Sequence, residues 1–287
     1  MLGSYGFGTY IVRPLLKWAG GKRHIADELF KSFPCDWNSG RYFEPFVGGA
    51  AMYLHLVPIR AKISDLNIRL VNFYKHVKLN HVTLADLIDD FVFNFNSEAE
   101  EAKNDYYLQI RKQFNDSLHE SLESAALLYV INKLCFNGLY RENSKGGYNV
   151  PFGKRKKFPN FQRNDLFEAS KILTETEIVN QDFADSVVDA RSGDFVYFDP
   201  PYIPLTTTSS FTSYNSAGFG IDQQKKLATV MLELKNLGVK AICSNSDTHL
   251  TREIYGAHRI DTILAPRMVS ASALGRGNIS ELVIKNF

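Results

Sequence analysis

The tetrapeptide Asp199-Pro200-Pro201-Tyr202 directly follows residues 195–198, an apolar run with the composition of a buried strand. A proline cannot donate to a β-ladder and restricts the residue before it, so two consecutive prolines end the strand. In open α/β sheets, ligands bind outside the carboxyl ends of the strands. The tetrapeptide therefore predicts a carboxylate and an aromatic ring at a ligand-binding edge.

These groups suit the methylation of an exocyclic amine on a planar heterocycle. The lone pair of an aryl amine is delocalised into its ring, which makes the amine a poor nucleophile. The Asp199 carboxylate and the Pro200 carbonyl can accept its two N–H groups and localise the lone pair, while Tyr202 stacks on the ring. The alternative is an ordinary turn that ends a strand and caps a helix, and the tetrapeptide fits both equally.

A second candidate site lies near the N-terminus, where residues 42–51 have the pattern of a short strand, a glycine turn and a helix that opens on small residues. Glycines let a backbone approach a ligand closely, as in nucleotide-binding βα turns. About twenty residues further on, Asp65 ends another predicted strand, where an acid can bind a ribose diol. The pair predicts an adenosine-binding site, whereas the glycine turn alone is more often an ordinary tight turn.

Six motifs occur in order along the chain, at 17–22, 43–49, Asp65, 137–141, 149–153 and 199–202. In this order they resemble the Dam-type DNA adenine N6-methyltransferases, including the DpnII-type restriction-modification enzymes. The resemblance implies a site-specific enzyme that transfers a methyl group from S-adenosylmethionine to N6 of a flipped adenine. It also implies double-stranded DNA as the partner and GATC as the usual site.

The resemblance assigns expected roles to individual residues. The catalytic group would be Asp199, Pro200, Pro201 and Tyr202. Trp18 would face the sulfonium of the cofactor, Asp182 would accept from its adenine amino group, and Phe183 would pack on the adenine unless it is an ordinary core aromatic. The residues implied for the cofactor are Trp18, Lys22 (for its carboxylate), Phe43, Glu44, Pro45, Phe46, Gly48, Asp65 (for its ribose), Asp182, Phe183 and Asp199.

The middle of the chain separates its charges. Residues 86–105 hold seven acids against one lysine, and residues 136–160 hold six basic residues against one acid. Within the basic segment, Gly146-Gly147 between Tyr140 and Tyr148 predicts a β-hairpin with a basic tip. Such a hairpin fits the major groove, where arginine can bind guanine, and nearby basic residues can hold phosphates. The alternative for residues 154–157 alone is a solvated charged surface.

By resemblance, Arg141 would read the guanine of the site, Leu139 and Pro151 would contact neighbouring bases, and Asn137 with Tyr140 would support the hairpin. The residues expected to bind DNA are Asn137, Leu139, Tyr140, Arg141, Asn143, Lys145, Pro151, Lys154, Arg155 and Lys156.

Alternating strand and helix patterns predict an α/β fold. Strands are expected at 41–44, 61–64, 176–180, 194–199, 239–244, 259–264 and 281–286, with a helix at 222–237. Helical patterns at 84–95, 99–114 and 122–136 interrupt them, and residues 205–216 have the composition of a long mobile loop. We expect a doubly wound methyltransferase sheet (1–69 and 172–287) with an inserted, mostly helical target-recognition domain (70–171) that carries the hairpin.

Composition is compatible with this interpretation. The 287 residues are 45% hydrophobic with a net charge of +2, so a DNA partner must be inferred from local charge. Three widely separated cysteines and seven scattered histidines indicate neither a disulfide framework nor a metal site. We expect no membrane span, no obligate protein partner and a cytoplasmic, nucleoid-associated protein of bacterial or phage origin.

Several alternatives stay open at this level. Asn245 and Asp247 can line the target pocket or cap the next helix, and we favour the cap. The loop at 267–276 has the family's basic, small-residue character, although no contact can be assigned to its arginines. The same four catalytic residues also suit cytosine N4, another adenine context or RNA. A catalytically silent DNA-binding regulator and an enzyme acting on protein amides are further alternatives, which the intact Asp199 and the basic hairpin disfavour.

Overall fold

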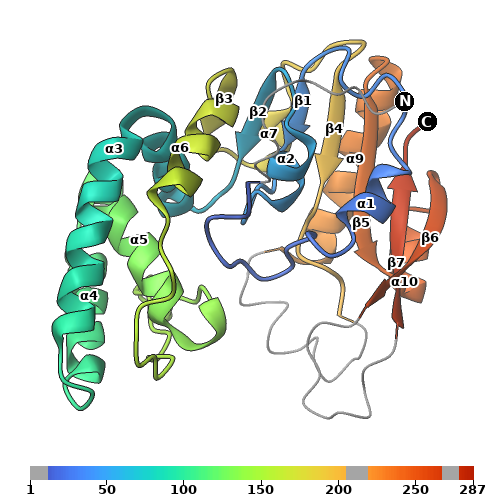
Figure 1. Cartoon of the computed structure of the whole chain (residues 1–287). Coiled ribbons are helices and arrows are strands. Elements are labelled where there is room, and N and C mark those ends of the chain that lie inside the picture. Colours follow the sequence, from blue (N-terminus) through green and yellow to red (C-terminus); the bar gives the residue numbers. More distant parts are fainter. Residues whose placement is uncertain (1–11, 205–218, 267–277) are drawn as a thin grey trace. The chain divides into compact units, whose positions relative to one another are not determined.

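The chain is a mixed α/β protein whose computed structural model describes residues 12–204, 219–266 and 278–287. It divides into two compact units (Figure 1). The sheet unit comprises Lys22–Val47, Pro58–Leu66 and Glu175–Phe287, and the helical unit comprises the chain up to Gly21, Gly48–Val57 and Asn67–Thr174. The loop predicted at 205–216 and the basic loop at 267–276 lie outside the described residues.

The sheet unit is built on a seven-stranded sheet of order β3-β2-β1-β4-β5-β7-β6. Strands β1 to β5 pair in parallel, while β7 is antiparallel to both of its neighbours. Every strand predicted from the sequence is confirmed. The bounds are β1 (Tyr42–Glu44), β2 (Ala61–Ser64), β3 (Thr176–Val179), β4 (Phe195–Phe198), β5 (Lys240–Ser246), β6 (Arg259–Pro266) and β7 (Asn278–Lys285).

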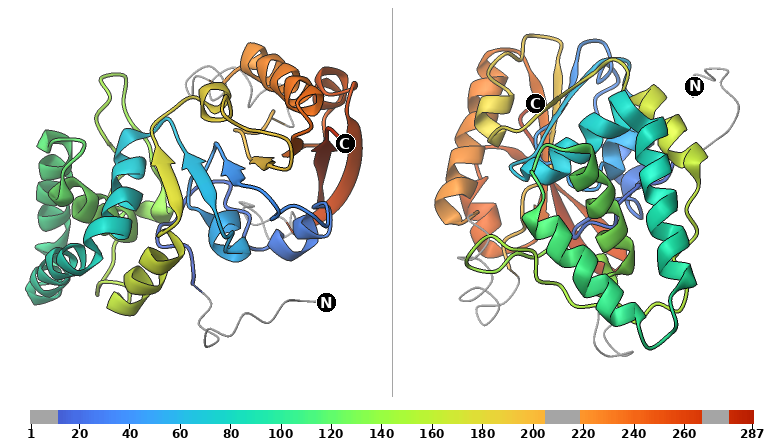
Figure 2. Two further views of the ribbon diagram at one scale, coloured as in Figure 1. Left: turned by 90° about the horizontal axis from the view of Figure 1, so that it is seen from above. Right: turned by 90° about the vertical axis from the view of Figure 1, so that its left-hand side faces the viewer.

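Helices cover both faces of this sheet. Helix α1 (Ala26–Phe30) lies on one face, and α7 (Phe183–Ser186) and α9 (Ile221–Asn236) lie on the other, with α10 (His249–Ile254) following β5 (Figure 2). Leu227, Met231 and Leu234 of α9 share one hydrophobic core with Val196 and Cys243 of the sheet. The helix predicted at 222–237 is therefore confirmed, with its apolar stripe in the core.

Strand order fixes where a ligand can bind. Strand β1 has β2 on one side and β4 on the other, so the connections that leave the carboxyl ends of β1 (toward β2) and of β4 (toward β5) diverge to opposite sides. Such a switch point opens a crevice at the carboxyl ends of the strands, which is where open α/β sheets bind ligands. Glu44, Asp65, Asp182 and Asp199 all follow or end strands at this edge.

The helical unit contains the three helices predicted for the insert. Its elements are α2 (Ala51–Leu56), α3 (Ile68–Ser97), α4 (Lys103–Asp116), α5 (Leu122–Leu134), the 3-10 turn η1 (Phe136–Gly138) and α6 (Arg163–Ile172). Helix α5 is buried almost throughout and packs against α3 and α4. Helix α3 starts well before the predicted residue 84, because the Asn67 side chain accepts from the Arg69 and Leu70 amides and caps it.

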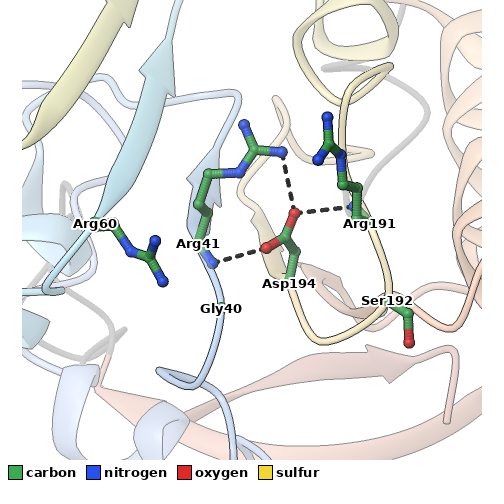
Figure 3. Close-up of a pocket in the computed structure, with 6 residues that line it drawn as sticks. All are labelled: Gly40, Arg41, Arg60, Arg191, Ser192 and Asp194. Carbon is green, nitrogen blue, oxygen red and sulfur yellow. Dashed lines mark hydrogen bonds and ion pairs between the residues drawn. The ribbon is translucent and has the colours of Figure 1, made fainter.

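At the amino edge of the sheet, an ion-pair network holds the segment that leads into β4. Arg41 donates to Asp189 at 2.6 Å and to Asp194 at 3.2 Å, and Lys62 donates to Asp189 at 2.9 Å. Asp194 also accepts from the backbone amides of Arg41 and Arg191. Arg41, Arg191 and Asp194 line a hollow of about 410 Å³ together with Gly40, Arg60 and Ser192 (Figure 3). This network ties β1 and β2 to the start of β4.

The network makes a prediction about acid stability. Burial alone would raise the pKa of Asp189, but Arg41 and Lys62 outweigh it and lower the pKa to about 2. An unfolded aspartate has a pKa of about 3.9. The stabilisation that the ionised Asp189 contributes is therefore present above that pH and is lost as the pH falls through about 2. We expect Asp189→Asn to lower the free energy of unfolding at pH 7 and to match the wild type near pH 2, measured by urea unfolding.

Glu175→Gln is the matched control, because it removes an exposed acid from the same unit. Its difference from the wild type should change little between pH 7 and pH 2. A pH-independent deficit for Asp189→Asn would contradict the assignment.

Candidate active site

Asp199 is the first residue after β4, and its carboxylate is held by two donors from other parts of the sheet unit. Lys22 Nζ lies 2.9 Å from Asp199 Oδ1, and Ser244 Oγ donates to the same oxygen at 3.0 Å. Lys22 itself is 4% exposed. No described residue donates to Asp199 Oδ2, and the side chain keeps 17% of its surface exposed. The carboxylate thus has one oxygen committed to the protein and one available to a ligand.

The electrostatics of this group reflect its burial. Desolvation raises the pKa of Asp199 above its usual value, and the charge and hydrogen bond of Lys22 and the hydroxyl of Ser244 hold it down. The Lys22 ammonium also lies over the ring of Tyr202, 4.2 Å from its centroid, in a cation–π contact. The sequence had placed Lys22 with the cofactor carboxylate and did not predict its pairing with Asp199.

The loop after Asp199 is fixed at three points. Tyr202 donates through its hydroxyl to Glu281 Oε2 at 2.8 Å. Gln224 donates to the Pro201 carbonyl at 2.9 Å, and Asn245 accepts from the Ile203 amide at 3.1 Å. These anchors come from α9, β5 and β7, which lie far apart in the sequence.

The predicted capping role of Asn245 or Asp247 is wrong. Thr248 caps α10 by accepting from the Thr251 amide at 3.0 Å. Asp247 pairs with Arg252 at 2.7 Å, and Asn245 is buried against the loop after Asp199. A threonine three residues before a helix amide satisfies the same local pattern, so the sequence did not separate these candidates.

Aromatic side chains and acceptors cluster at the carboxyl ends of β1 and β3. Phe46 and Phe183 stack with centroids 5.5 Å apart, and Phe219 meets Phe46 edge-on at 5.4 Å. Asp182 caps α7 and pairs with Lys226 at 3.0 Å. Phe183 is a core residue of the sheet unit as well as a neighbour of Asp182.

Three further acceptors lie at this edge. Gln181 Oε1 is buried and accepts no hydrogen bond from the described residues. Glu44 is buried and accepts from the Tyr42 hydroxyl at 2.7 Å. Asp65 is half-buried after β2, and its carbonyl accepts from Asn180 at 2.8 Å. The edge therefore presents acids and a buried amide oxygen that can receive ligand donors.

Trp18 and the glycine turn belong to the helical unit. Gly48 has a φ of +46°, and a Cβ on it would lie 2.9 Å from Trp18 Cδ1, so a side chain there would be both strained and crowded. Trp18 also stacks on Tyr140 with centroids 5.1 Å apart. A residue expected at the cofactor and one expected at the DNA are therefore in direct contact. Buried Asn132, which the sequence did not single out, holds the Lys17 backbone through two hydrogen bonds of 2.8 Å.

The basic segment of the helical unit forms a short hairpin. Glu142 and Tyr148 form an antiparallel bridge, and the Asn143 amide donates to the Gly147 carbonyl at 2.8 Å. The turn carries Gly146 at a φ of +77°. The Asn143 side chain accepts from the amides of Lys145 and Gly147, so its oxygen is used inside the turn. The hairpin indicated by the two glycines is present.

Arg141 stands on this hairpin and is exposed. Its Nε donates to Asn149 Oδ1 at 2.7 Å across the two hairpin arms. Of the other residues expected at DNA, Asn137, Leu139, Lys145, Pro151 and Lys154 are exposed, while Tyr140 and Arg155 are half-buried.

The expected separation of charge is incomplete. Lys156 pairs with Glu100 at 3.0 Å, and Arg163 bridges Asp86 and Asp89. Members of the acidic segment are therefore neutralised by basic residues that follow the hairpin, and Lys156 is engaged in an ion pair.

Comparison with known proteins identifies the family to which this chain belongs. The model of the D12 class N6 adenine-specific DNA methyltransferases matches residues 18–267. The chain belongs to this family. It is 38% identical over 282 residues to the type II methyltransferase M1.LlaDCHI of Lactococcus lactis subsp. cremoris, covering 96% of each chain. It is 37% identical over 273 residues to the DNA adenine methylase of Vibrio cholerae serotype O1, covering 94% of this chain and 95% of that one. It is 37% identical over 289 residues to the type II methyltransferase M.MjaIII of Methanocaldococcus jannaschii, covering 96% and 99%.

The protein is thus an adenine-specific DNA methyltransferase. Among its described residues, no group of three histidines, cysteines or acids is placed to hold a metal ion. In the same part of the chain, every helix is too short or too polar to cross a membrane. Its three cysteines are unpaired thiols.

The Ser244 contact of the methyltransferase makes a prediction about pH dependence. We expect the ionised form of Asp199 to be the active one, because a carboxylate is a stronger acceptor than a carboxylic acid, so turnover should fall as the pH drops through its pKa. Ser244→Ala removes a donor to the carboxylate and should raise that pKa further. We expect the acidic limb of the kcat/KM profile to move to higher pH, with kcat/KM at pH 7 reduced by about tenfold, the effect of losing one hydrogen bond to a charged group.

Tyr197→Phe is the control, because the Tyr197 hydroxyl bonds Ser244 at 2.9 Å without touching Asp199. It should lower stability and leave the pH profile in place. An unmoved acidic limb in Ser244→Ala would contradict the electrostatic role of the hydroxyl.

Proposed function

We propose that this methyltransferase transfers a methyl group from S-adenosylmethionine to N6 of an adenine flipped out of duplex DNA, within the sequence GATC. The observation that carries the chemistry is the Asp199 carboxylate, which is half-buried at the switch-point edge with Oδ2 left available. The resemblance of residues 137–141 and 149–153 to the Dam-type enzymes supports GATC.

Asp199, Pro200 and Tyr202 receive the target base. The base stacks on the Tyr202 ring, which contributes about 1–3 kcal/mol and offsets part of the few kcal/mol that flipping costs. Asp199 Oδ2 and the Pro200 carbonyl accept the two amine protons, so that the lone pair points away from both acceptors. Asp199 need not act as a strong base, because the proton would leave only from the cationic nitrogen that results once the N–C bond replaces the methyl–sulfur bond, and either Asp199 or water can take it.

The residues at the carboxyl edge fit a nucleoside-containing methyl donor. The unpaired Gln181 oxygen and the Asp182 carboxylate offer acceptors for an adenine amino group beside the Phe46 and Phe183 rings. We assign Asp65 to the ribose diol. When bound, S-adenosylmethionine supplies an electrophilic methyl group on a sulfonium centre. Trp18, Lys22, Phe43, Glu44, Pro45 and Gly48 are the remaining residues that we assign to it.

The helical unit supplies sequence recognition in this proposal, as an inserted target-recognition domain at 70–171. Asn149 orients the Arg141 guanidinium by accepting from Nε and, at 3.4 Å, from Nη2, which leaves Nη1 and the second hydrogen of Nη2 for guanine O6 and N7. Leu139 and Pro151 are exposed for base contacts, and Lys145 and Lys154 are exposed for phosphates. The remaining residues that we assign to DNA binding are Asn137, Tyr140, Asn143, Arg155 and Lys156. Asn143 shapes the turn, and Lys156 can exchange its ion pair with Glu100 for a phosphate.

The deciding experiment is the transfer of a labelled methyl group from S-adenosylmethionine to two matched duplexes, one with GATC and one with that tetramer scrambled. We expect labelled N6-methyladenosine from the GATC duplex alone. Equal label on both duplexes would keep the chemistry and reject GATC. Labelled N4-methylcytosine, or label only on an RNA of the same sequence, would assign the activity to another substrate.

Asp199→Asn tests the catalytic assignment. An amide retains the shape of the side chain and loses the negative charge, so we expect kcat to fall at least about 100-fold, the scale of removing one preorganised electrostatic contact. Binding of DNA and of S-adenosylmethionine, measured separately by fluorescence anisotropy and calorimetry, should stay within a few-fold of the wild type. Weak DNA binding with normal turnover at saturation would exclude this role.

Arg141→Ala tests base reading against simple charge. Discrimination between GATC and duplexes altered at the guanine should fall by about 1–3 kcal/mol, because one bidentate contact is lost. Lys154→Ala is the matched control and should weaken both duplexes alike while reducing the salt slope by about 1. Equal losses for cognate and altered duplexes in Arg141→Ala would show that this arginine does not read the base.

A further inference from the structure

Strand β7 brings a second carboxylate to the edge that carries Asp199. In register, Glu281 of β7 lies opposite Ser246 of β5 and Ile263 of β6. No motif of the sequence singled it out. It is half-buried, and its Oε2 accepts from the Tyr202 hydroxyl at 2.8 Å.

The Tyr202 ring is therefore held by two different contacts. The Lys22 ammonium sits over its face at 4.2 Å from the centroid, and Glu281 holds its hydroxyl at the far end of the ring. The hydroxyl oxygen lies on the axis of the Cβ–Cγ bond, so the contact with Glu281 fixes the direction of that axis, while the ammonium over the face opposes rotation of the ring about it. Only the two contacts together fix the orientation of the ring.

The tyrosine hydroxyl is suited to be a permanent donor to this acid. Burial and the negative charges of Asp199 and Glu281 raise the pKa of Tyr202 well above its usual value, so the hydroxyl keeps its proton throughout the neutral range. A hydrogen bond from a neutral hydroxyl to a carboxylate is among the stronger hydrogen bonds of proteins.

We propose that Glu281 is a positioning residue of the methyltransferase, which fixes the tilt of the Tyr202 ring on which the extruded base stacks. The inference rests on the proposed function of Tyr202 as that stacking surface. Glu281 does not touch the base in this account. It acts by setting the height and tilt of the base above Asp199 Oδ2, and thereby the fraction of bound bases whose amine reaches both acceptors.

Three variants distinguish the effect of the Tyr202–Glu281 hydrogen bond from the effect of the Glu281 charge and from a loss of stability. Glu281→Gln keeps an oxygen that can accept from Tyr202, Glu281→Ala removes it, and Tyr202→Phe removes the donor while keeping the ring. Glu177→Ala is the control, since it removes another strand glutamate of the same sheet, at 54% side-chain exposure. Each is measured for melting temperature, DNA affinity, and kcat and KM on the cognate duplex. Fluorescence of 2-aminopurine at the target adenine reports base extrusion.

We expect Glu281→Ala and Tyr202→Phe to lower kcat by a similar factor, about 10-fold to 100-fold, as for loss of one hydrogen bond to a charged group. DNA affinity should stay within a few-fold of the wild type, and the 2-aminopurine signal should show an extruded base that is less uniformly stacked. The double variant should be no slower than either single one, because both changes remove the same contact. Glu281→Gln should recover most of the activity, and Glu177→Ala should behave as the wild type.

Several outcomes would overturn the inference. These are a Glu281→Ala enzyme within twofold of the wild type, a Glu281→Gln enzyme as slow as Glu281→Ala, or additive losses in the double variant. If Glu281→Ala does not fold, the comparison of Tyr202→Phe with Glu281→Gln still decides, since the first must be slow and the second nearly normal. Tyr202→Ala separates this failure from that of the proposed function. If Tyr202→Ala is impaired in extrusion and Glu281→Ala is not, only the positioning role falls, whereas a normal Tyr202→Ala enzyme removes the stacking surface itself.

Discussion

The Asp199 carboxylate at the end of β4 is largely removed from water, and other residues of the sheet unit must compensate for its lost hydration. Removing a charge from water costs several kcal/mol unless it is paired and hydrogen-bonded. Asp199 Oδ1 pairs with the Lys22 ammonium and accepts a hydrogen bond from the Ser244 hydroxyl. The protein thus offsets desolvation through one oxygen and keeps the other for a ligand. A fully satisfied carboxylate would be more stable and chemically idle.

The loop that carries this carboxylate is shaped by side chains rather than by regular backbone pairing. Its two prolines cannot donate ladder hydrogen bonds. Three polar side chains from separate elements hydrogen-bond to the loop instead. Gln224, Asn245 and Glu281 bind the loop at Pro201, Ile203 and Tyr202 in turn. Two of these polar residues are themselves joined, since Asn245 donates to Gln224 at 3.0 Å. A connected network of this kind holds an irregular segment in one conformation.

Local sequence patterns predicted what depends on local physics. All seven strands, the helix at 222–237 and the hairpin around Gly146 follow from apolar periodicity and turn chemistry, and the strand end at Asp199 follows from two prolines. What the sequence did not predict depends on contacts between distant segments. The pairing of Lys22 with Asp199, the Asn132 contact with Lys17 and the partner of Tyr202 on β7 all require the topology first. The assignment of Asn245 as a helix cap failed for a different reason. Thr248 satisfies the same local pattern and caps α10, while the Asn245 side chain bonds Ile203 and Gln224 instead.

The placement of β7 between β5 and β6 has a consequence for the order in which the molecule assembles. Strand β6 precedes β7 in the chain, yet its only neighbour in the described sheet is β7. During synthesis β6 therefore emerges before the strand that it pairs with, and it can join the sheet only through β7. The side chain of Asn286 then ties β7 to the Ala241 amide and the Val239 carbonyl. Glu281 belongs to β7, so a nascent chain that already contains residues 199–202 still lacks the acceptor of the Tyr202 hydroxyl.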